Sequence, residues 1–83
     1  MKNAIKLLLQ NGATISCAYK PTPESWIGTA QIHTFDSSFV VDGGFERLES
    51  KDIDKAVNYF CSKVFCKENL CYRKDKIHQD WGG

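Results

Sequence analysis

The spacing of hydrophobic residues changes along the chain, and the first pattern predicts a helix. Ile5, Leu8 and Leu9 recur at steps of three and four residues, which is typical of one face of a helix. Asn3 is a suitable N-cap, and Asn11-Gly12 supplies a left-handed residue that ends the helix. Because so short a helix is unstable alone, we expect its apolar face to pack on the rest of the protein.

The next part of the chain alternates between apolar and polar residues, which predicts strands. The expected strands are 14–19, 26–35, 38–41 and 45–48. A loop with two prolines separates the first two of them, and Asp36-Ser37 and Asp42-Gly43-Gly44 are turn sequences between the others. The pattern therefore predicts an antiparallel meander of three or four strands.

A second helix is expected after Ser50, which is a suitable N-cap, with Asp52 and Asp54 placing negative charge in its first turn. Its apolar face should carry Ile53, Val57, Phe60 and Val64. We expect this face to pack against Leu8, Leu9, Trp26, Ala30 and Ile32. The aromatic side chains of Trp26, Phe39, Phe45 and Phe60 are all assigned to the core.

These elements define an α+β fold in the order helix, three or four strands, helix, with both helices on one face of the sheet. The chain of 83 residues has room for a single core. Its 42% hydrophobic and 25% charged residues are typical of globular proteins and not of disordered ones. We expect a compact domain over residues 1–66, followed by a basic and aromatic segment, 67–83, that either packs on the domain or projects from it.

Charge and hydropathy favour a cytoplasmic protein without membrane contact. The formal net charge of +1 gives no long-range attraction to nucleic acid or to an anionic membrane. The apolar run near the N-terminus ends at Gln10, too early for a signal peptide, and no stretch is long enough to span a membrane. Without an export signal, reduced thiols are favoured over disulfides.

Cys61, Cys66 and Cys71 are spaced five residues apart, and together with His78 they suggest zinc as an alternative. Structural zinc sites usually pair ligands two to four residues apart. On a continuous helix, steps of five rotate successive residues by roughly 140°, so these thiols would not converge. We therefore predict free cysteines, no metal and no cofactor. Because no motif joins a nucleophile to a base, we also predict that the protein is not an enzyme.

The order of the elements resembles that of double-stranded RNA-binding domains. Such domains carry lysines at the start of the last helix, whereas the corresponding residues here, Ser50-Lys51-Asp52-Ile53-Asp54-Lys55, alternate acids with bases. The run Trp26–Val64 also looks like small domains of antitoxins and other mobile-element proteins. These resemblances imply a nucleic-acid-binding or antitoxin-like module, which is the alternative function.

By elimination, the sequence favours a binding module that engages a protein or a ribonucleoprotein and inhibits or regulates it. Small inhibitors encoded by phages or mobile elements, including the anti-CRISPR kind, are the class that we expect. Aromatic and basic side chains dominate binding hot spots. The predicted partner-binding residues, acting with one flank of the sheet, are Tyr72, Arg73, Lys74, Lys76, His78 and Trp81. The identity of the partner and the oligomeric state stay open.

Overall fold

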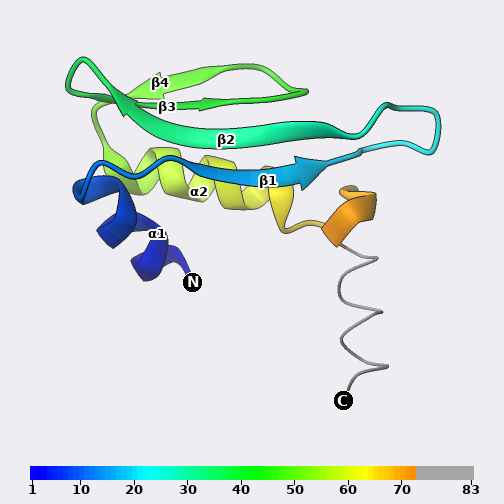
Figure 1. The fold of residues 1–83 in the computed structure, drawn as a ribbon, viewed down its shortest axis with the longest axis horizontal. Coiled ribbons are helices and arrows are strands. Elements are labelled where there is room, and N and C mark those ends of the chain that lie inside the picture. The colour runs from blue at the N-terminus through cyan, green and yellow to red at the C-terminus, as the bar shows by residue number, and fades with distance from the viewer. Residues whose placement is uncertain (73–83) are drawn as a thin grey trace.

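The computed structural model describes residues 1–72 and shows an α+β fold (Figure 1). In chain order the elements are α1 (Lys2–Gln10), β1 (Ile15–Tyr19), β2 (Gly28–Phe35), β3 (Ser38–Asp42), β4 (Leu48–Ser50) and α2 (Ile53–Val64). The strands form one antiparallel sheet in the order β1-β2-β3-β4. Figure 1 shows both helices on the same side of this sheet. The predicted fold class is confirmed, with four strands.

The sheet is a meander whose central hairpin closes through the predicted turn Asp36-Ser37. These two residues have φ angles of 51° and 67°, which are the left-handed conformations that a two-residue hairpin turn requires. The fourth strand differs from the prediction, because β4 begins only at Leu48. Phe45, which was expected in that strand, instead packs its ring edge-to-face on Tyr19 at 5.2 Å and on Tyr59 at 5.7 Å.

The core lies between the sheet and the two helices. Its fully buried members include Ala30 and Ile32 from β2 and Val57, Phe60 and Val64 from α2. Leu9 of α1 is also buried, whereas Ile53 is only partly buried and packs at the margin of this cluster. The predicted packing of α2 on α1 and β2 is therefore confirmed for these residues.

Two members of the predicted core are wrong, namely Leu8 and Trp26. Leu8 is 50% exposed, because α1 directs Ile5 and Leu9 inward and Leu8 lies about 100° around the helix from Leu9. Trp26 is 94% exposed. The alternating pattern suggested a strand from Trp26 onward, but β2 begins at Gly28, so Trp26 lies in the preceding loop.

The starts of both helices also differ from the prediction. Asp52 is the N-cap of α2, and its carboxylate accepts hydrogen bonds from the backbone N–H groups of Asp54 and Lys55 at 2.9 and 3.4 Å. Ser50 is the last residue of β4, and its hydroxyl accepts from the N–H of Asp52 at 3.1 Å. In α1 the N-cap is Met1 and not Asn3, without a side-chain hydrogen bond.

Candidate partner-binding surface

Only one of the predicted partner-binding residues lies within the described part of the chain. Tyr72 is partly buried, and its ring packs edge-to-face on Phe65 with 5.6 Å between the centroids. Tyr72 therefore contacts its own domain. The other predicted residues lie outside the described residues: Arg73, Lys74, Lys76, His78 and Trp81.

Asn69 fixes the start of the predicted basic and aromatic segment to the domain. Its side chain is almost completely buried, with 1% exposed. The side-chain NH2 group donates to the carbonyls of Val64 at 2.7 Å and Ala18 at 3.3 Å. The side-chain oxygen accepts from the N–H groups of Lys20 at 3.1 Å and Cys71 at 3.3 Å. One amide thus joins the end of α2, the end of β1 and the segment itself.

The backbone of the segment makes a further bond to the same end of β1. The N–H of Leu70 donates to the carbonyl of Lys20 at 2.9 Å, and a helical turn starts at Leu70 (Figure 1). Ala18 and Lys20 are two residues apart, so their backbone groups point to the same side of the strand, away from β2. Residues 69 and 70 therefore cover the free edge of β1 where it enters the next loop.

The loop between β1 and β2 lies at this end of the molecule and presents two apolar side chains to solvent. Trp26 is 94% exposed and Ile27 is 67% exposed. The loop contains an ordered turn, in which the N–H of Ser25 donates to the carbonyl of Thr22 at 3.1 Å and their hydroxyls lie 2.6 Å apart. We call the surface formed by residues 20–27 and 69–72 the loop-end surface.

The second surface is the face of the sheet opposite the helices (Figure 1), on which Val40 is fully buried and Ser38 is 8% exposed. By strand alternation and register it carries Ser16, Ala18, Thr29, Gln31, His33, Phe35, Ser38, Val40, Asp42 and Glu49. None of these strand residues is a lysine or arginine, and the neighbouring Arg47 lies 3.9 Å from the Glu49 carboxylate, so basic charge on this face is sparse. Phe35, which is 63% exposed, lies at the end of β2 remote from the loop-end surface.

The four cysteines are free in the structure. Burial raises the pKa of the Cys17 thiol above its ordinary value of 9.0, and the nearby Cys61 thiol raises this pKa further. Burial also raises the pKa of Cys61, although the positive charges of Lys2 and the N-terminus oppose the rise. Both groups are therefore protonated and weakly nucleophilic at neutral pH. Within residues 1–72, no three Cys, His, Asp or Glu side chains are arranged to hold a metal ion.

Sequence reasoning missed two residues of the loop-end surface. Trp26 was assigned to the core because its spacing fits the strand that follows, and Asn69 received no role. The prolines at 21 and 23 were the available signal for Trp26, since they place it close to a loop. Asn69 carried no comparable signal, because a single amide in a polar segment is usually solvated.

Comparison with protein-family models, with curated proteins and with solved structures finds no match to this chain. Among residues 1–72, no helix is both long enough and apolar enough to cross a membrane.

Proposed function

We propose that the chain is a small, non-catalytic binding module that engages a protein or ribonucleoprotein partner in the cytoplasm and inhibits or regulates it. Phage and mobile-element inhibitors, including the anti-CRISPR kind, are the class of protein that it fits. The observation that carries this proposal is the exposure of Trp26, 94%, beside Ile27, 67%, in a loop whose base is tied to residues 69–70.

The physical basis of the proposal is the cost of leaving a tryptophan in water. A tryptophan buries roughly 150–250 Å² when it is covered, which at about 25 cal/mol per Å² corresponds to about 4–6 kcal/mol of favourable transfer free energy. Part of this gain is lost to ordering when a loop is mobile before binding. The turn at Thr22–Ser25 and the bonds to Lys20 reduce that loss, because they order the loop in advance.

The predicted basic residues come next in the sequence. Arg73 and Lys74 directly follow Tyr72, which belongs to the loop-end surface. In the proposed complex they face an acidic patch of the partner protein, and their main effect is on the association rate. The partner thus combines an apolar pocket for Trp26 with acidic residues beside it.

A protein partner is favoured over the alternative, a double-stranded RNA-binding or antitoxin-like module. At the start of α2, where double-stranded RNA-binding domains place lysines, Asp52 caps the helix and Asp54 occupies its first turn. Negative charge at this position repels phosphate. The strands of the open face likewise carry Asp42 and Glu49, and the neighbouring Arg47 lies 3.9 Å from Glu49.

The test is capture of the partner from lysate of the cells in which the chain acts, using wild type, Trp26→Ala and Phe35→Ala. Phe35 is the matched control, because it is also exposed but lies at the other end of β2. We expect Trp26→Ala to weaken binding by at least about thirtyfold, as hot-spot residues do. Phe35→Ala should bind normally, and both variants should keep the wild-type thermal midpoint.

Charge variants complete this experiment. Arg73→Ala/Lys74→Ala should lower the association rate, and Trp81→Ala should weaken binding, while neither changes the thermal midpoint. Normal capture by Trp26→Ala would remove the loop-end surface from the interface. Retention of RNA or DNA in a strongly salt-dependent manner, without a bound protein, would instead support the nucleic-acid alternative.

A further inference from the structure

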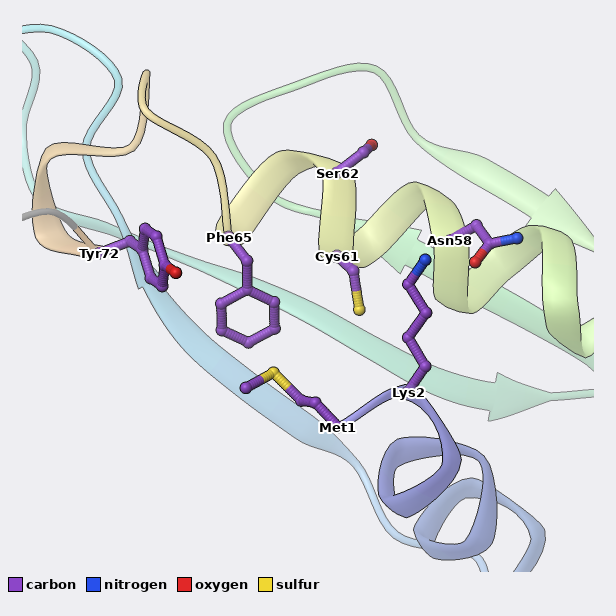
Figure 2. Close-up of a pocket in the computed structure, with 7 residues that line it drawn as sticks. All are labelled: Met1, Lys2, Asn58, Cys61, Ser62, Phe65 and Tyr72. Carbon is purple, nitrogen blue, oxygen red and sulfur yellow. The ribbon is translucent and has the colours of Figure 1, made fainter. Parts of the chain in front are cut away.

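A second site lies between the start of α1 and the last turns of α2, and it meets the loop-end surface at Tyr72. It is an open pocket of about 350 Å³, and Figure 2 shows the side chains that line it. This volume is at the lower end of the range of roughly 300–1,000 Å³ that small-molecule sites occupy. The pocket therefore fits a ligand with a single ring better than a large one.

One side of the pocket is apolar. The rings of Phe65 and Tyr72 pack edge-to-face there, with an angle of 69° between their planes, and the thioether of Met1 lies beside them (Figure 2). Aromatic rings and methionine sulfur both make favourable contacts with a further ring. Tyr72 and Met1 come from distant parts of the chain, so the pocket exists only in the folded domain.

The other side of the pocket is positively charged. Figure 2 shows the Lys2 ammonium group and the Asn58 amide next to the Cys61 thiol. No acidic residue among residues 1–72 lines the pocket. Lys2 is also absent from the two ion pairs of these residues, which are Lys6–Asp54 and Arg47–Glu49. Lys2 therefore carries a charge that no carboxylate within residues 1–72 neutralises.

We propose that this pocket binds a small aromatic monocarboxylate, whose ring lies against Phe65 and Tyr72 and whose carboxylate pairs with Lys2. The separation of the apolar side from the charged side fixes the orientation of the ligand. Trp26 and Ile27 do not line this pocket, so it shares only Tyr72 with the loop-end surface.

The test uses 3-phenylpropionate as the probe and the full chain in amide NMR titrations. We expect shift changes confined to residues around the pocket, including Asn58, Cys61 and Phe65, with a Kd of about 1 mM or tighter, as for a fragment-sized ligand. The neutral analogue 3-phenylpropionamide has the same shape without the charge. It should bind about fivefold more weakly, because it loses the ion pair with Lys2.

Two variants separate the specific site from general attraction to a basic surface. Lys2→Gln should weaken 3-phenylpropionate binding about fivefold, which is the upper range for an exposed ion pair. Lys6→Gln is the matched control, since Lys6 lies on the same helix but pairs with Asp54 and does not line the pocket. It should bind like wild type. The proposal would be overturned if 3-phenylpropionate and 3-phenylpropionamide bound equally well, or if Lys2→Gln bound 3-phenylpropionate as tightly as wild type. It would also be overturned if the NMR shift changes lay outside the pocket.

Discussion

Substitution of Asn69 by alanine tests whether one buried amide holds the C-terminal part of the described chain in place. The change removes two bonds to backbone carbonyls and two from backbone N–H groups. The bond to the Val64 carbonyl is buried, so its loss leaves an unsatisfied acceptor at about 1–3 kcal/mol. The other three are partly buried, and water can replace part of each, so they contribute about 0.5–1 kcal/mol apiece.

Together these losses lower the free energy of unfolding by about 3 kcal/mol or more. A domain of this size has roughly 4–12 kcal/mol in total, so the variant should lose a large part of its stability. At about 4–8 °C per kcal/mol, the thermal midpoint should fall by roughly 10–25 °C. Circular dichroism during urea and thermal unfolding measures both quantities. Asn58→Ala is the matched control, because Asn58 is an exposed asparagine of α2 and should change stability by less than about 0.5 kcal/mol.

Hydrogen exchange locates the effect. In Asn69→Ala, the amides of Lys20 and Cys71 should lose protection more than those of the central strands, because their acceptor is gone. The reasoning is refuted if Asn69→Ala is as stable as Asn58→Ala and the Lys20 amide exchanges at its wild-type rate. Such a result would mean that residues 66–72 are held by other contacts.

Three further predictions concern the core residue Phe60, the tightly packed Gly43 and the thiol of Cys17. Phe60→Ala should cost about 3–5 kcal/mol, measured by urea unfolding, and an unchanged midpoint would exclude Phe60 from the core. Gly43→Ala should destabilise by about 1–3 kcal/mol, because a Cβ there would lie 2.9 Å from the Cα of Ala30. Gly28→Ala, whose Cβ would lie 3.8 Å from its nearest contact, should be nearly neutral, and equal losses would contradict the argument. The raised pKa of Cys17 contributes stability that is fully present below pH 9.0 and is lost as pH rises through the folded-state pKa. Between pH 8 and pH 10, the free energy of unfolding should therefore decline less for Cys17→Ala than for wild type. An identical decline in both proteins would refute the link between the Cys17 pKa and stability.

The predictions that succeeded rest on patterns that local geometry determines. Val57, Phe60 and Val64 recur at helical spacing, and the turn at Asp36-Ser37 separates two apolar runs, so the helix and the hairpin follow from neighbouring residues alone. The failures depend on the angle at which elements dock. Leu8 and Leu9 are equally apolar, and only the position of α1 against α2 decides which of them is buried.

The candidate surfaces were less predictable than the fold, for the same reason. The burial of Asn69 requires the end of β1 and the end of α2 to meet, and these ends are far apart in the sequence. The pocket beside Lys2 likewise needs Met1 and Tyr72 to come together. No periodic pattern in the sequence predicts such contacts between distant segments. Trp26 shows a second reason for failure. An aromatic residue next to a strand continues the alternating sequence pattern whether its side chain is buried or exposed.

The strand order has a consequence for how the chain folds. Each strand pairs with its neighbour in the sequence, so the sheet can assemble by closing short loops, at a small entropic cost for each. The contact between α1 and α2 joins the two ends of the described chain and closes the largest loop. Topologies dominated by local pairing fold quickly. We therefore infer that the hairpin of β2 and β3 forms early and that docking of α1 completes folding, so that α1 is also the first element to be released when the domain opens.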